Sequence, residues 1–175
     1  MPRYNGGMSG GRWDRVDEII EQWREQRPDL DREPMAVFGR LKRLEWAANA
    51  AIEACLGEHG LSRGEFDVLA TLRRSGEPYT LAPTALARWM MLSSAAMTNR
   101  VDRLEAAGLV ERRPDPGDRR GVLVALTPDG RQVVDAAVAD HVENERRLLE
   151  PLSEDERRTL NALLRKLLLG WRGGQ

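Results

Sequence analysis

One stretch of the sequence gathers hydrogen-bonding side chains of the kinds that can contact nucleic acid. The residues from Ser93 to Ala107 have helical periodicity and carry hydroxyl, amide and guanidinium groups. Ser and Thr can bond phosphates, whereas Asn and Arg can form hydrogen bonds with base edges in the major groove. A serine-rich helix start is also typical of simple N-capping, so this stretch alone leaves both interpretations open. The candidate DNA contacts here are Ser93, Ser94, Thr98, Asn99, Arg100 and Arg103.

A second group of basic residues lies in a turn-rich segment. Residues 109–113 and 122–126 favour β-strands, and the segment 114–121 between them is rich in turn formers, so we expect a β-hairpin with a long charged tip. An Arg at such a tip can enter a narrow minor groove, which attracts it electrostatically, although a charged loop is usually only solvated. The hairpin candidates are Arg119 and Arg120 at the tip, Asp118 as a partner that holds one of them, and Arg112 and Arg113 as phosphate contacts on the stem.

The charge of this region differs from that of the whole chain. The 175 residues have a net charge of −1, which argues against nonspecific coating of nucleic acid. Between residues 88 and 131, eight Arg and six acidic residues leave a net charge of +2. Nearly all basic residues are Arg, which suits bidentate contacts, although a GC-rich genome would give the same bias. The local charge is compatible with a sequence-specific DNA reader.

Other chemistry finds little support in the residue pattern. Cys55 lies on the apolar stripe of a predicted helix, so we expect a buried thiol rather than a redox sensor. His59 and His141 lie far apart without a cluster of ligands, and we expect no metal site. Because no catalytic constellation is present, we expect no cofactor and no enzyme activity. Trp46 and Trp89 are expected to be packing residues.

The elements that must position these residues form a helical frame around the hairpin. Apolar spacing and capping signals predict two helices before residue 60, three between Ser62 and Ala107, and two after Thr127. The start at Pro83 is weak because Ala82 is a poor cap. The outer helices are more amphipathic than a small lobe can cover, which suggests that two chains share a helical bundle. We therefore expect a mainly α fold with a small β wing, divided into a disordered tail (1–11), N-terminal helices for dimerisation and a ligand pocket (12–60), a winged helix-turn-helix lobe (61–127) and C-terminal dimerisation helices (128–175).

Compartment follows from what the sequence lacks. No run of 18 or more apolar residues is present, so no membrane span is expected. The glycine-rich first 11 residues have no apolar core of a signal peptide. With a single cysteine, the chain is expected in the reducing cytoplasm.

Three segments of the sequence resemble the MarR family of transcriptional regulators. SSAAMTNRVDRLE at 93–105 is similar to the family's recognition helix, LEAAGLVERRPDPGDRRG at 104–121 to its wing, and LTPDG at 126–130 to the start of its next helix. The resemblance covers about residues 36–170. It implies an obligate homodimer that binds a palindromic operator on double-stranded DNA, in most members a repressor released by a small phenolic or anionic ligand.

An N-terminal extension with the sequence EQWREQRPDLD at 21–31 resembles the extra helix of the family's urate-responsive branch. That resemblance implies an anionic purine effector, with Trp23 stacking on it and an Arg pairing with its charge. Its other residues would be Asp67, Arg88 and Arg100. Trp23 as a plain core residue stays an alternative, as do constitutive DNA binding without a ligand and a winged helix that contacts only protein.

Overall fold

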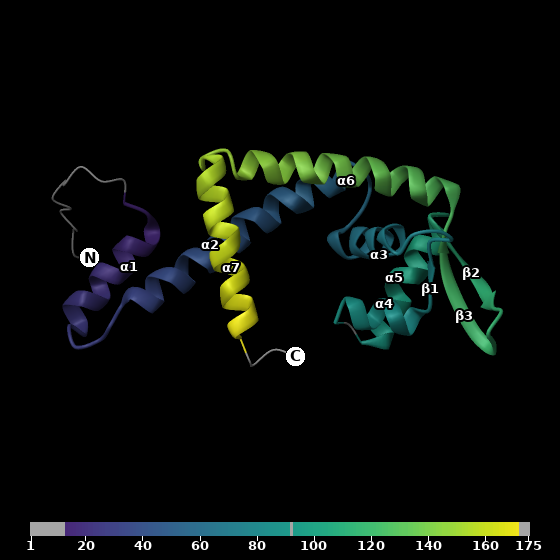
Figure 1. The fold of residues 1–175 in the computed structure, drawn as a ribbon, viewed down its shortest axis with the longest axis horizontal. Coiled ribbons are helices and arrows are strands. Elements are labelled where there is room, and N and C mark those ends of the chain that lie inside the picture. The colour runs from purple at the N-terminus through teal and green to yellow at the C-terminus, as the bar shows by residue number, and fades with distance from the viewer. Residues whose placement is uncertain (1–12, 92, 172–175) are drawn as a thin grey trace, which may run out of the picture. The chain divides into compact units, whose positions relative to one another are not determined.

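The computed structural model describes residues 13–91 and 93–171 and is mainly helical, with one small sheet (Figure 1). The predicted tail at 1–11 lies outside the described residues. The mainly α fold with a small β wing is confirmed. The elements in chain order are α1 (Arg15–Gln26), α2 (Glu33–Gly57), α3 (Arg63–Arg74), β1 (Thr80–Leu81), α4 (Pro83–Trp89), α5 (Ser94–Ala106), β2 (Val110–Asp115), β3 (Asp118–Leu126), α6 (Pro128–Leu148) and α7 (Glu154–Gly170).

The chain divides into two compact units, and the boundary falls inside α2. The first unit runs to Asn49 and contains α1 and most of α2, and the second contains everything from Ala50 onward. The functional division proposed from the sequence, with boundaries after residues 60 and 127, stays a prediction about what each part does.

Helix starts follow the capping signals of the sequence. Ser62 and Glu65 form a reciprocal box at α3, in which Glu65 Oε2 accepts the Ser62 N–H at 2.9 Å. A second box of the same kind begins α7. Thr127 caps α6 by accepting the N–H of Gly130 at 2.9 Å. Ala82 provides no side-chain bond at α4, as expected. Asp14 is the cap of α1, and the sequence analysis above does not predict it.

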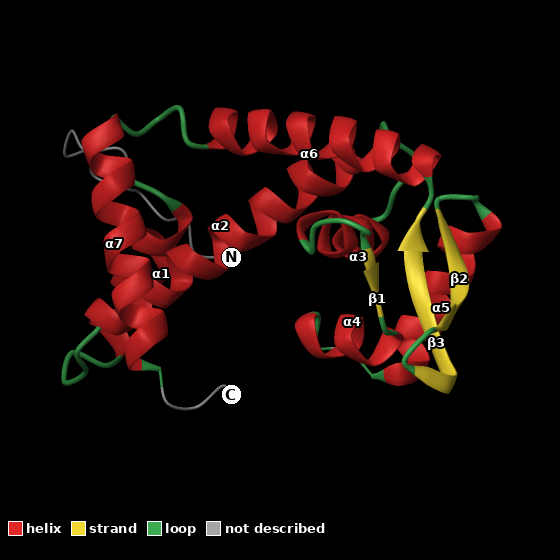
Figure 2. Cartoon of the chain, turned by 45° about the vertical axis from the view of Figure 1, so that its right-hand side comes forward, coloured by secondary structure: helices red, strands yellow, loops and turns green. Residues whose placement is uncertain are grey.

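The sheet differs from the prediction in two ways. Its three antiparallel strands have the order β1-β3-β2, and the two-residue strand β1 was not predicted (Figure 2). The hairpin strands are also longer than expected, so the eight-residue tip shrinks to a turn at 116–117. Asp115 Oδ1 accepts the N–H of Gly117 at 2.8 Å, and Asp118 Oδ1 accepts that of Arg120 at 3.0 Å. These local bonds allow the ladder to continue into a segment whose composition suggested a loop.

The core of the second unit lies between the short helices, the sheet and α6. Side chains from α3, α4, α5, β3 and α6 are completely or almost completely buried there. Since this core joins the α4–α5 pair to the hairpin, it fixes how both are presented. Its members include Leu69, Leu72, Leu86, Met97, Val101, Leu104, Val124 and Val134.

Several apolar residues expected to be packed are exposed. Along α2, Ile52 and Leu56 are buried, whereas Phe38 and Leu44 are exposed in the single chain, as a helix shared between two chains would be. Trp46 and Trp89, expected as packing residues, are 76% and 68% exposed. The expectation failed because apolar periodicity tells which face of a helix would be buried, not whether another element covers it. The last helix is the extreme case, since none of its residues is buried.

Candidate nucleic-acid interface

Helix α5 turns one face to the core and leaves the opposite face open. Met97, Val101 and Leu104 anchor it, whereas Thr98 and Asn99 are exposed. Ser93 is the N-cap, and its hydroxyl accepts the N–H of Ala96 at 3.3 Å; Ser94 is exposed at the first helical position. The capping interpretation of Ser93 is therefore correct, and it leaves a contact with DNA untested.

The two arginines of α5 turn toward the start of α3. Arg100 Nη1 donates to the carbonyl of Gly64 at 3.5 Å, and Arg103 Nε lies 3.1 Å from Glu65 Oε1. A Cβ at Gly64 would come within 2.6 Å of Arg100 Cζ, so a larger residue there would displace this guanidinium. Partial burial acts to raise the pKa of Glu65, but hydrogen bonds from Ser62 and the charges of Arg103 and Arg100 hold it below its usual value.

The opposite flank of α5 is bound to the wing. Arg112 of β2 forms ion pairs with Asp102, at 2.5 Å, and with Glu105, and its backbone N–H also donates to Glu105 at 3.0 Å. Because successive side chains of a strand point to opposite faces, the neighbouring Arg113 does not join these ion pairs. It is exposed and paired with Glu111. The stem thus holds the wing against α5 through Arg112.

The two arginines that follow the hairpin turn remain open to solvent. Arg119 and Arg120 are exposed residues of β3, and neither has a carboxylate partner among residues 13–91 and 93–171. The carboxylate of Asp118 accepts the backbone N–H of Arg120, where the chain reverses, so its predicted role of holding an arginine side chain stays a prediction.

The predicted ligand residues are divided between the two units. Trp23 belongs to the first unit, where it lines a groove between α1 and α2. Asp67, Arg88 and Arg100 belong to the second, on α3, α4 and α5. A single site formed by all four stays a prediction.

The remaining candidates have structural partners. Cys55 is half-buried rather than fully buried, and its pKa is raised mainly by desolvation. His59 Nε2 lies 2.9 Å from Asp140 Oδ2, and the ring of His141 packs 5.1 Å from that of Phe66. In the described part of the chain, no group of three metal-ligating side chains is suitable for a metal ion. No helix there is long and apolar enough to cross a membrane.

The order α3-α4-α5 followed by the β2–β3 hairpin defines a winged helix-turn-helix protein. A family model described as "MarR family" matches residues 59–121. The transcriptional regulator PecS of Dickeya dadantii is 46% identical over 149 residues, which cover 85% of this chain and 90% of that protein. The multiple antibiotic resistance protein MarR of Salmonella typhimurium is 36% identical over 105 residues, covering 59% and 71% of the two chains.

Solved structures agree with these sequence relatives. A mutant of MarR from E. coli, complexed with operator DNA, has a TM-score of 0.68 and 28% identity, covering 80% of this chain and 99% of that one. The chain therefore belongs to the MarR family of DNA-binding transcriptional regulators. Its relatives are regulators and not enzymes, in agreement with the absence of a catalytic pattern.

Proposed function

We propose that this protein is a homodimeric repressor that binds a palindromic operator and is released by a small anionic or phenolic ligand. The observation that supports it most is the pair of exposed arginines on the wing, Arg119 and Arg120, beside a helix whose open face presents Thr98 and Asn99. In this arrangement α5 enters the major groove and the wing enters the adjacent minor groove. Ser93 and Ser94 contact phosphates at the helix start. Such a regulator acts in the cytoplasm, on chromosomal DNA.

The dimer is supported by apolar surface that one chain leaves uncovered. On α7, Leu163, Leu167 and Leu168 recur at helical spacing and are 52–74% exposed. A patch of this kind is typical of an interface between subunits. A twofold axis would pair two α5 helices with the two halves of a palindrome.

The effector is supported by resemblance and by the position of Trp23 in a groove. Urate or another purine is the candidate that the urate-responsive branch implies. Trp23 stacks on it, and Asp67, Arg88 and Arg100 complete the predicted site. Arg100 lies on α5 and also contacts the start of α3. A ligand that pairs with the charge of Arg100 would therefore shift α5, the helix proposed to enter the major groove.

A mobility-shift titration on the DNA upstream of the protein's own gene, with and without urate, tests both parts. We expect a dimer complex whose affinity falls by about 1,000-fold or more between about 50 and 200 mM salt, as several phosphate contacts require. Loss of the complex on addition of urate, abolished by Trp23→Phe, would support the purine effector. A complex indifferent to urate rejects that effector, and a failure to bind this and other candidate operators at low salt rejects the repressor.

Arg112 is proposed as a positioning residue in place of the direct phosphate contact that the sequence suggested. Arg112→Ala should weaken operator binding about 10-fold, because it frees the wing and leaves Asp102 and Glu105 uncompensated near phosphate. Since the three side chains are 31–55% exposed, the loss of stability should be only about 1 kcal/mol.

The control for Arg112 adds Asp102→Asn and Glu105→Gln to the Arg112→Ala variant, with operator affinity as the readout. If the loss comes from the two uncompensated acids, this triple variant recovers most of the affinity; if it comes from the freed wing, the triple variant stays as weak as Arg112→Ala alone. Unchanged operator affinity of Arg112→Ala itself would contradict both roles.

A further inference from the structure

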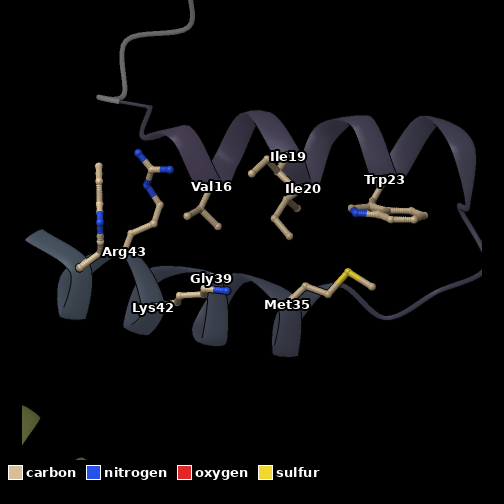
Figure 3. A pocket seen from close by; sticks show the side chains of 9 residues that line it. Val16, Ile19, Ile20, Trp23, Met35, Gly39, Lys42 and Arg43 are labelled. Carbon is tan, nitrogen blue, oxygen red and sulfur yellow. The ribbon is translucent and has the colours of Figure 1, made fainter.

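A groove of about 530 Å³ runs between α1 and the first part of α2 (Figure 3). Its walls are mostly apolar, with Val16 and Ile20 on α1 facing Met35 and Gly39 on α2. Trp23 and Met35 lie toward one end of the groove, and Lys42 and Arg43 lie toward the other (Figure 3). Its size is within the usual range for small-molecule sites, which are largely apolar with a few polar groups.

The two helices that form the groove are held together at its basic end. Arg40 on α2 donates to Asp14 at 2.8 Å and to Asp17 at 2.5 Å, the two residues of the α1 capping box. Beside this clamp, Val16 is only 3% exposed and closes the bottom. A Cβ at Gly39 would approach Val16 Cγ1 to 3.1 Å, so the glycine allows the close approach there. The groove is therefore held in shape by ion pairs and packing within this unit.

The charge of the groove is not balanced. Lys42 and Arg43 are exposed on its rim, and within the described ranges 13–91 and 93–171 no carboxylate forms an ion pair with either. Arg40, one turn away from Arg43, is by contrast engaged by two carboxylates. An apolar channel with two uncompensated cations at one end is complementary to a molecule with an apolar body and one negative group.

We propose that this groove binds an amphipathic organic anion, with its carboxylate or sulfonate at Lys42 and Arg43 and its apolar body against Val16, Ile20 and Trp23. From Val16 to Trp23 the helix rises about 10 Å, which is room for a medium-chain acid. The proposal names a further class of effector for the proposed repressor and rests on the proposed function for any effect on DNA. The groove is lined by residues of the first unit alone and shares only Trp23 with the proposed purine site.

Calorimetric titration of the full-length protein with decanoate, and with decanol as the uncharged analogue, tests the proposal. Decanoate should bind, and Lys42→Gln combined with Arg43→Gln should weaken its binding about 10-fold while leaving decanol unchanged. The matched control is Arg15→Gln with Arg24→Gln, which removes two charges that local ion pairs hold on α1 and should leave both ligands unaffected. Bromodecanoate should quench tryptophan fluorescence on contact, and Trp23→Phe should reduce that quenching.

Two results would overturn the proposal. The first is no binding of decanoate, and the second is equal loss of affinity in the charge variant and its control. If decanoate does not bind and Lys42→Gln with Arg43→Gln weakens the dimer in sedimentation equilibrium, the groove is assigned to a second copy of the chain. These titrations contain no DNA, so operator binding without decanoate binding rejects only this proposal. Decanoate binding without any operator complex rejects only the proposed repressor.

Discussion

Arg119→Ala combined with Arg120→Ala should weaken operator binding roughly 100-fold, about 1.4 kcal/mol for each arginine. Both side chains are exposed on β3 without a carboxylate partner in the described residues, so their charge is available to the narrow groove that attracts Arg. The slope of log affinity against log salt should also decrease by about two, because two cations no longer displace counterions. Mobility-shift titrations at several salt concentrations give both values.

The control for the wing variant is Arg15→Ala with Arg24→Ala. This pair removes the same charge from α1, where Arg15 and Arg24 are engaged by Glu18 and Glu21. The control should keep the affinity and the salt slope of the parent protein. If the wing variant also keeps both, the wing does not enter a groove, and α5 alone would have to account for DNA binding.

Gly130→Ala should lower the free energy of unfolding by about 3 kcal/mol, an overpacking cost against backbone. Gly130 is buried in the first turn of α6, and a Cβ there would lie 1.9 Å from the carbonyl oxygen of Leu109. That carbonyl cannot easily move, because it accepts the N–H of Thr127 at 3.2 Å while Thr127 Oγ1 donates to Gly108. Denaturant unfolding at matched protein concentration measures the change.

The matched control for Gly130→Ala is Gly57→Ala at the end of α2. A Cβ at Gly57 would meet nothing within 4 Å, so the substitution should change stability by no more than about 1 kcal/mol, in the stabilising direction. Equal stability of the two variants would mean that the contact between Gly130 and the Leu109 carbonyl can rearrange without loss of unfolding free energy. The turn at 108–109 links α5 to the wing, so Gly130→Ala should also weaken operator binding if α5 and the wing contact DNA as proposed.

The local signals of the sequence were reliable because the interactions behind them join residues only a few positions apart. The boxes of Ser62 with Glu65 and of Ser153 with Glu156 each close within one turn, and Thr127 with Pro128 starts α6 in the same way. The two-residue strand β1 escaped prediction because it exists only through its pairing with Val124 and Ala125, more than forty residues later.

At the candidate site, local sequence signals do not tell which arginines are paired within the protein and which are open to solvent. From the sequence, Arg100, Arg103 and Arg112 were candidates for DNA contacts as well as Arg119 and Arg120, because all five lie in the segment with the residue types of a DNA reader. In the fold the first three contact other parts of the protein: Arg100 contacts Gly64, Arg103 contacts Glu65 and Arg112 contacts the acidic pair of α5. The charge and hydrogen-bonding groups of a side chain follow from its residue type. Whether another residue of the protein already pairs with them depends on which residues the fold brings close.

The sequence by itself determined the helical frame, the hairpin and the family, because periodicity, caps and motifs are properties of neighbouring residues. Only the tertiary structure decided that Arg119 and Arg120 are the open cations of the wing and that Trp23 shares a groove with Lys42 and Arg43. The physical reason is the same in both cases. An ion pair or a groove requires side chains from different elements to come within a few ångströms, and that proximity is a result of folding.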